Sequence, residues 1–453
     1  MTEERSLSRR RFLELGFKGS AAFTGLGMLG LDSLVSAQPG PACAEDYRAL
    51  VCVFLVGGAD SANLIVPRSA AQYATYAAGR GSLAEPLDSL LPITPATSDG
   101  AQYGLNGQVP ELASRFEQGR LAFVANLGPL VEPITRAELT AGSVPVPARL
   151  FSHNDQQRQW QLAQADATHG HGWCGRLADR IVGLNGGALL PTNTSLDGPV
   201  PLVVGATTYP FTTSSEGPSL LWNLPVGSTR RDALLALLTE REHALEDSFS
   251  RAQVEAIVLN ALVSDALVEA PTFEGLFDAS PLAVRLQRVA QIVSVRATLG
   301  MKRQIFVVAA QGFDTHDHQR EALPGLFRNL STSLESFQTA IEEINAASIV
   351  TTFTSSEFGR TLTGNGRGSD HGWGGHALVL GDGVLGGDIY GRMPSQELGG
   401  PDDAGDGRMI PTIAVDQFAA TLSRWFGLPP AELGAVFPNL GNFDSADLGF
   451  LAG

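Results

Sequence analysis

The sequence predicts an α/β fold: a mostly parallel central sheet with helices on both faces, plus a helical insertion. Short, continuous apolar runs recur along the chain and are typical of strands covered on both faces. Segments with a helical hydrophobic period lie between these runs, and alternating strands and helices favour a parallel sheet. With 453 residues, of which 43% are hydrophobic, the chain can bury a large core.

Residues 1–37 are predicted to be a twin-arginine export signal and not part of the fold. The stretch "SRRRFLELG" precedes a short, glycine-rich apolar run and then "VSA", a small-residue cleavage pattern that ends at Ala37. No segment of the chain approaches about 20 uninterrupted apolar residues. We therefore expect the twin-arginine export machinery as a partner, a periplasmic or extracellular location, and no stable membrane span in the mature chain.

Charge and cysteine content narrow the classes of partner. The formal net charge of −16 repels nucleic acid and anionic lipid, so we expect no nucleic-acid partner. Cys43, Cys52 and Cys174 form no CxxC pair and do not support a structural zinc cluster, although export would permit one disulfide.

The mature chain, residues 38–453, is predicted to be a single domain. Buried strands are expected, in chain order, at 49–56, 121–127, 201–206, 304–310, 348–354 and 376–381. Helical patterns cover 109–119, 174–184 and 326–345, and the end of the chain, 415–443, is predicted to form a helix, a turn and a packed tail. From about 229 to 299 the pattern is helical with no convincing strand, which predicts an insertion or cap on the sheet domain.

Ligands of parallel sheets gather at the carboxyl ends of strands, so the residues after each predicted strand are the candidate site. "GGADSAN" follows the first strand and lacks the third glycine of a dinucleotide fingerprint. Asp60 is a candidate oxygen ligand or an Asx-turn residue, and Asn63 is a candidate substrate contact.

"QGFDTHDHQ" follows the 304–310 strand. In extended backbone, side chains at positions i, i+2 and i+4 point to one side, so Asp314, His316 and His318 are predicted to converge on one cation. Zinc and manganese accept such a mixed imidazole and carboxylate set. The alternative is a polar surface loop with incidental histidines, and the clustering of the residues argues against it.

Two further segments add candidate ligands. Glu357, in "SSEFGRT" after the 348–354 strand, suits capping or ion pairing when taken alone but becomes a candidate ligand beside the other strand ends. Asp370, His371 and His376 lie in the glycine-rich "SDHGWGGH" that precedes the last strand. Of the eight histidines, only His243 lies outside a glycine- or aspartate-rich loop, which scattered histidines would not do.

"SHNDQQRQWQ" is the remaining candidate segment. Ser152 is interpreted either as a helix cap, the commoner role, or as a nucleophile that benefits from the free N–H groups and dipole of a helix N-terminus. Arg158 and Arg176 are the nearby cations that could hold an oxyanion.

Together, "FLVGGADSANLIVP", "SHNDQQRQWQ", "GWCGRLAD", "GFDTHDHQ" and "SEFGRTLTGNGRGSDHGWGGH" resemble a bacterial, twin-arginine-exported family catalogued as domain of unknown function 1501. The resemblance covers nearly all of the mature chain in the same order. That family is grouped with the alkaline phosphatase and sulfatase superfamily. The resemblance therefore implies an alkaline phosphatase-like three-layer sandwich, with a central sheet between helical layers. It also implies a site for two divalent ions (zinc, manganese or calcium) at the strand ends.

Carried over by position, the resemblance implies Asp60 as a ligand, Ser152 as the nucleophile, and Asp314 with His316 or His318. It further implies either Asp370 and His371 or Glu357, with His371 or His376 as the last ligand. The chain departs from the superfamily pattern because Glu357 and Phe358 stand where Asp-His-Gly is expected, and "SDHG" comes one loop later. Either the ligand set is rearranged or one metal is lost.

These observations favour a metal-dependent hydrolase of phosphate or sulfate esters, acting on a small molecule or a polysaccharide. The alternative is a secreted binding or scaffold protein that keeps the fold, with polysaccharide recognition as one form. An exported redox protein is the third hypothesis, but no haem, flavin or iron–sulfur motif accompanies it.

Overall fold

The computed structural model of the chain describes residues 46–452, except 98, 168, 222 and 240–243. The predicted export signal, Cys43 and His243 lie outside the described residues. The described chain divides into two compact units, Pro218–Asp265 and the combination of 46–217 with 266–452. The central sheet and the candidate site both belong to the larger unit.

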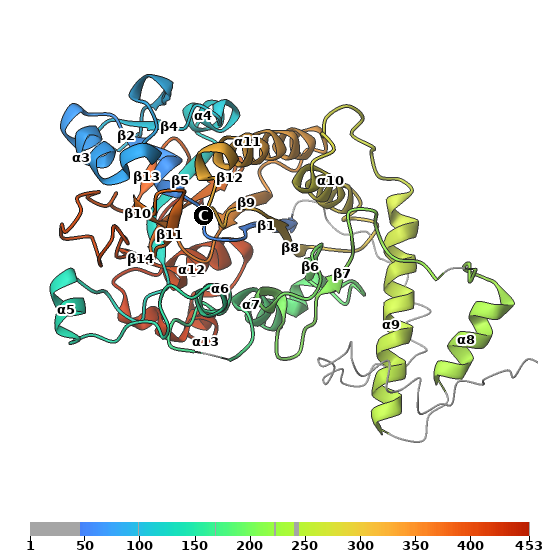
Figure 1. Ribbon diagram of the computed structural model, residues 1–453. Helices are drawn as coiled ribbons and strands as arrows, with labels where there is room; N and C mark the ends of the chain where they lie inside the picture. The colour runs from blue at the N-terminus through green and yellow to red at the C-terminus, as the bar shows by residue number, and fades with distance from the viewer. Residues whose placement is uncertain (1–45, 98, 168, 222, 240–243, 453) are drawn as a thin grey trace, which may run out of the picture. The chain divides into compact units, whose positions relative to one another are not determined.

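A nine-stranded sheet forms the centre of the larger unit (Figure 1). Its strands are β1 (Arg48–Leu55), β5 (Leu121–Gly128), β6 (Asn193–Ser195), β7 (Phe211–Thr212), β8 (Arg303–Ala310), β9 (Val350–Ser355), β12 (Gly375–Leu380), β13 (Ile389–Tyr390) and β14 (Ile413–Ala414). They are ordered β13-β5-β12-β9-β1-β8-β6-β7, and β14 also pairs with β5. Only β12 runs antiparallel to its neighbours, β5 and β9, among the described pairs. The predicted α/β class with a mostly parallel sheet is confirmed.

Helices cover both faces of this sheet (Figure 1). One face packs against α4 (Pro110–Glu117), α10 (Pro281–Ser294) and α11 (Gln319–Glu343). The other face carries α6 (His153–Leu162), α7 (Trp173–Ile181), α12 (Val415–Phe426) and α13 (Leu433–Val436). Side chains alternate between the two faces along a strand, and Leu50, Cys52 and Phe54 of β1 share one buried cluster with this second group of helices.

Smaller elements complete the two units. A three-stranded antiparallel sheet joins β2 (Ile65–Pro67), β4 (Tyr103–Leu105) and β3 (Leu91–Ile93), next to α3 (Ala70–Arg80). A hairpin joins β10 (Arg360–Gly364) and β11 (Ser369–His371), and α5 (Arg136–Ala141) is a short helix. The smaller unit contains α8 (Thr229–Thr239) and most of α9 (Ala244–Leu267). No described helix is both long enough and apolar enough to cross a membrane.

The described part of the stretch from 229 to 299 contains the helices α8, α9 and α10 and no strand, and residues 268–280 between α9 and α10 form turns and irregular chain. Its helices divide between the two units, however, because α10 packs against α11 and β8 of the larger unit. Ser280 explains the start of α10: its side chain accepts a hydrogen bond from the backbone N–H of Ala283, and Pro281 occupies the first helical position.

The strand predicted at 201–206 is wrong. Pro201–Val203 forms a short 3-10 helix that begins with a proline, which cannot donate to a strand ladder. The place beside β8 is taken by β6, whose sequence "NTS" carries no apolar pattern. Leu202 and Val203 are nevertheless buried in the cluster beneath the sheet. Cys52 and Cys174 are buried free thiols.

Asp416 in the first turn of α12 predicts a pH-dependent stability. Its residue is 1% exposed, and burial raises the pKa of its carboxyl to about 8. The folded chain therefore keeps this proton up to about pH 8, whereas the unfolded chain releases it near pH 4. We expect this group to lower the free energy of unfolding as pH rises from 4 to 8, with a slope of up to about 1.4 kcal/mol per pH unit. Above about pH 8 the carboxyl is ionised in both states and contributes no further pH dependence.

The Asp416→Asn variant tests this expectation by urea unfolding at pH 5, 7 and 9. The difference in unfolding free energy between variant and wild type should shift in favour of the variant as pH rises from 5 to 8. Parallel pH profiles for the two proteins would contradict the prediction.

Candidate metal centre

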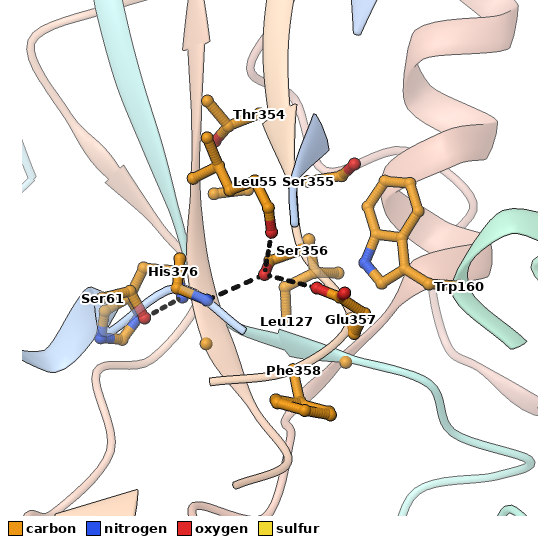
Figure 2. A pocket seen from close by; sticks show the side chains of 14 residues that line it. Leu55, Ser61, Leu127, Trp160, Thr354, Ser355, Ser356, Glu357, Phe358 and His376 are labelled. Carbon is orange, nitrogen blue, oxygen red and sulfur yellow. Dashed lines mark hydrogen bonds between the residues drawn. The ribbon is translucent and has the colours of Figure 1, made fainter. Parts of the chain in front are cut away.

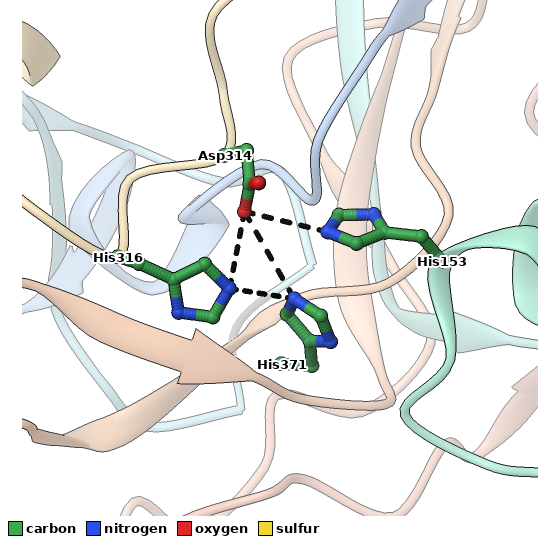
Figure 3. Close-up of side chains that lie close together, drawn as sticks. All are labelled: His153, Asp314, His316 and His371. Carbon is green, nitrogen blue, oxygen red and sulfur yellow. Dashed lines mark hydrogen bonds and ion pairs between the residues drawn. The ribbon is translucent and has the colours of Figure 1, made fainter.

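Four side chains from distant parts of the sequence converge at the carboxyl edge of the sheet (Figure 3). His153 is the first residue of α6, Asp314 and His316 lie in the loop after β8, and His371 ends β11. One ligand atom from each residue lies within 4.8 Å of all the others. No second group of three or more such donors converges among the described residues, and this cluster suits one ion.

The three distances from Asp314 Oδ1 are close to those between ligand atoms around a single ion. Asp314 Oδ1 lies 3.3 Å from His153 Nε2, 3.2 Å from His316 Nε2 and 3.9 Å from His371 Nε2. Metal–ligand bonds of about 2.0 to 2.1 Å in a tetrahedron separate ligand atoms by about 3.3 Å. His153 Nε2 is buried and has no hydrogen-bond partner. The donor set, three imidazoles and one carboxylate, therefore fits a zinc-like or manganese-like ion.

The outer nitrogens of two rings are held by the protein. His316 Nδ1 lies 2.9 Å from Asp370 Oδ1, and His371 Nδ1 lies 2.6 Å from the carbonyl oxygen of Phe151. Both acceptors require a proton on Nδ1, which leaves each Nε2 without one when the ring is neutral. The two Nε2 atoms are 2.7 Å apart, so their lone pairs repel unless a cation or a proton lies between them.

The charge of the cluster is set by its neighbours. Burial alone would raise the pKa of Asp314, but the hydrogen bond and positive charge of Arg360 hold it below its usual value. The hydrogen bond from Asn365 lowers the pKa of Asp370. Burial lowers the pKa of His371. At neutral pH Asp314 and Asp370 are thus ionised and His371 is neutral. For the cluster members Asp314 and His371, these are the forms that bind metals.

Arg360 ties the strand ends together. Its guanidinium is fully buried and pairs with Asp314. Its remaining hydrogen bonds go to main-chain carbonyl oxygens of Gly57 and Gly58 after β1, of Phe313 after β8, and of Ser369 in β11. This one side chain therefore joins two loops and the β10–β11 hairpin around the cluster.

Glu357 lies behind the cluster and is not one of its four members. Its oxygens accept hydrogen bonds from the backbone N–H groups of Gly57, at 2.9 and 3.0 Å, and of Gly58, at 3.0 Å. Glu357 and His376 also line a cavity of about 30 Å³, room for about one or two water molecules (Figure 2).

Asp60 and Asn63 lie in a buried polar network next to α3. Asp60 forms an ion pair with Arg80 and accepts a hydrogen bond from Gln319. Asn63 accepts hydrogen bonds from Tyr76, at 2.8 Å, and from Arg80, at 2.9 Å. The structure does not bring Asp60 to the cluster, because Arg80 supplies its countercharge.

Two predicted histidine ligands lie apart from the cluster. The side chain of His318 is 69% exposed and pairs with Asp317. His376 Nδ1 accepts a hydrogen bond from the backbone N–H of Asn126 at 3.0 Å, and burial lowers the pKa of His376 to about 4. Asp370 orients His316 and is not a member of the cluster.

Ser152 directly precedes His153 of the cluster and occupies the N-cap position of α6. Its side chain makes no capping hydrogen bond, and the hydroxyl donates to Asp155 Oδ2 at 2.7 Å. Arg158 is exposed on the same helix. Arg176 is instead committed to the main-chain carbonyls of Leu162, His171 and Val436, and burial lowers its pKa to about 10.

Sequence reasoning missed His153 and Arg360. In "SHND", Ser152 and Asn154 are interpreted as helix caps, with Ser152 as the alternative nucleophile. His153 between them receives no role, although it belongs to the histidines in aspartate-rich loops. Arg360 was seen in "SSEFGRT" without a role. Nothing in the sequence signals that its side chain is buried among carbonyl oxygens.

A known family model matches most of the chain. The family model "Protein of unknown function (DUF1501)" matches residues 47–437. No curated protein matches the sequence.

Several solved structures are distantly similar. They include Ps i-CgsB in complex with k-i-k-neocarrahexaose, with 9% identity, 87% of this chain and 76% of that chain covered, and a TM-score of 0.33. The lipoteichoic acid synthase LtaP from Listeria monocytogenes has 8% identity, coverage of 84% and 72%, and a TM-score of 0.31. The PsFucS1 sulfatase from Pseudoalteromonas sp. has 9% identity, coverage of 93% and 74%, and a TM-score of 0.34. Similarity at this level does not specify an activity.

Proposed function

The chain belongs to the DUF1501 family of proteins of unknown function, and we propose that it is an exported, metal-dependent hydrolase of phosphate or sulfate esters. The convergence of His153, Asp314, His316 and His371 carries this proposal. A divalent cation held there would lower the pKa of a coordinated water and polarise an ester oxygen.

The charge of the site favours an anionic ester. Among the four cluster members, only Asp314 would bring a negative charge to a bound divalent cation. Asp370 and Glu357 add two negative charges around the cluster and Arg360 adds one positive charge, so the attraction for an anionic oxygen comes from the ion itself and is local. The first turn of α6 adds backbone N–H groups with no intrahelical acceptor, which attract anionic oxygens. These features support a phosphate or sulfate group as the part of the substrate that the site recognises.

Ser152 is the proposed protein nucleophile. It stands at the N-terminus of α6, next to the proposed ligand His153. Asp155 orients the Ser152 hydroxyl by accepting a hydrogen bond from it. The signal pattern in residues 1–37 supports export by the twin-arginine machinery to the periplasm or beyond. The ester is a small molecule or part of a polysaccharide.

Removal of the metal is expected to lower kcat/KM for nitrophenyl phosphate or nitrophenyl sulfate by more than about 100-fold, because the cation supplies several kcal/mol of transition-state stabilisation. Protein recovered with its metal would be assayed before and after chelation, and again after zinc, manganese or calcium is restored. Recovery with one of these ions identifies it.

The Ser152→Ala variant tests the proposed nucleophile in the same assay. Its metal content is measured as the control. Folded wild-type protein that binds none of the three ions contradicts the proposal. Metal-loaded protein that hydrolyses neither ester class favours the secreted binding protein instead.

A further inference from the structure

Glu357 is a buried carboxylate whose role is not that of a ligand. The residue is 1% exposed, and its charge is met by the N–H groups of Gly57 and Gly58 and by the Ser356 hydroxyl at 3.2 Å. A carboxylate that accepts several hydrogen bonds in this way is fixed in place. Its Oε1 lies 3.7 Å from His153 Nδ1, on the side of that ring opposite the ligand atom.

The three histidines of the metal centre follow one pattern. Asp370 holds the outer nitrogen of His316, and the Phe151 carbonyl holds that of His371. Glu357 is the acceptor next to the outer nitrogen of His153. At 3.7 Å this contact is longer than a hydrogen bond, which makes His153 the least firmly anchored of the three rings.

Packing against two neighbouring rings restricts the His153 ring, although its outer nitrogen has no close hydrogen bond. Its centroid lies 4.1 Å from that of His371 and 4.9 Å from that of Phe358, the residue after Glu357. A cation on Nε2 would make the Nδ1–H a stronger donor and draw it towards the Glu357 carboxylate. We propose that Glu357 positions His153, fixing the tautomer and ring orientation that direct Nε2 at the cation. This inference rests on the proposed metal centre.

The turn after β1 explains why Glu357 cannot easily move away. Gly57 and Gly58 have φ values of +120° and +87°, which L side chains rarely adopt. A Cβ on Gly57 would lie 2.2 Å from the backbone nitrogen of Asp314. The glycines therefore let two consecutive N–H groups face the carboxylate while the backbone passes directly beside the Asp314 ligand.

The Glu357→Gln variant is expected to bind Zn²⁺ or Co²⁺ about 10- to 100-fold more weakly than the wild type, the usual effect of losing a carboxylate behind a ligating histidine. Affinity would be measured by competition with a chromophoric chelator. Asp402→Asn is the matched control, because Asp402 is also a buried, ion-paired carboxylate but contacts Arg392 and none of the ligands. Its affinity should equal that of the wild type.

A double-mutant cycle separates positioning from general support of the fold. If Glu357 acts through His153, then Glu357→Gln should change affinity by less than about threefold in a His153→Ala background. The melting temperature of each metal-free variant checks folding. Glu357→Asp, which retracts the carboxylate from His153, is the second variant if Glu357→Gln does not fold, and it should also bind more weakly.

Equal loss of affinity in both backgrounds, or wild-type affinity in Glu357→Gln, would overturn the positioning role while leaving the metal centre in place. Failure of the folded wild type to bind either ion would overturn the metal centre itself, and this inference with it.

Discussion

A His316→Ala variant is expected to lose more than about 100-fold in affinity for a divalent cation, whereas His318→Ala keeps the wild-type affinity. Loss of a ligand exceeds the effect of losing an outer partner, which is itself up to about 100-fold. His316 Nε2 lies 3.2 Å from Asp314 Oδ1, but the His318 side chain is 69% exposed and pairs with Asp317. Ester hydrolysis should fall together with affinity in the first variant only.

Isothermal titration with Zn²⁺ and Mn²⁺, together with hydrolysis assays, would compare the two variants. They remove the same chemical group from two positions of one loop, so each is the control of the other. Similar losses in both variants, or a loss confined to His318→Ala, would contradict the assignment of His316 as the ligand.

The choice between His316 and His318 could not be made from the sequence. The expectation that Asp314, His316 and His318 share one side assumes extended backbone throughout. His318 adopts φ +51°, and the chain turns there to begin α11. This turn directs the imidazole of His318 to solvent. No local residue pattern predicts the turn.

The strand ends were predictable because long apolar runs indicate strands buried on both faces, as β1, β5, β8 and β9 are. The short strands β6, β13 and β14 were not, because two or three residues carry no period. The antiparallel direction of β12 was also not predictable from the sequence. Because β12 runs antiparallel to its neighbours, its first residue lies at the edge where the parallel strands end. His371, which ends β11 shortly before β12, is thereby brought to that edge.

Asp60 was predicted as a ligand from its place after β1, and the geometry favours a different role. Arg80, which pairs with Asp60, reaches it from the last turn of α3, and both side chains are fully buried. Sequence spacing gives no sign of this pairing, because any surface helix can carry an arginine in its last turn. The pairing predicts that Asp60 matters for stability and not for metal affinity.

The Asp60→Asn variant is therefore expected to lose about 3 to 5 kcal/mol of unfolding free energy, since it leaves the Arg80 charge buried and uncompensated. Urea unfolding would measure the loss. The double variant Asp60→Asn, Arg80→Met should recover part of it, because the unpaired charge is removed as well. Cation affinity should stay at the wild-type value in Asp60→Asn at temperatures where it is folded. A variant with wild-type stability but weakened cation binding would instead return Asp60 to the metal centre and require Arg80 to release it.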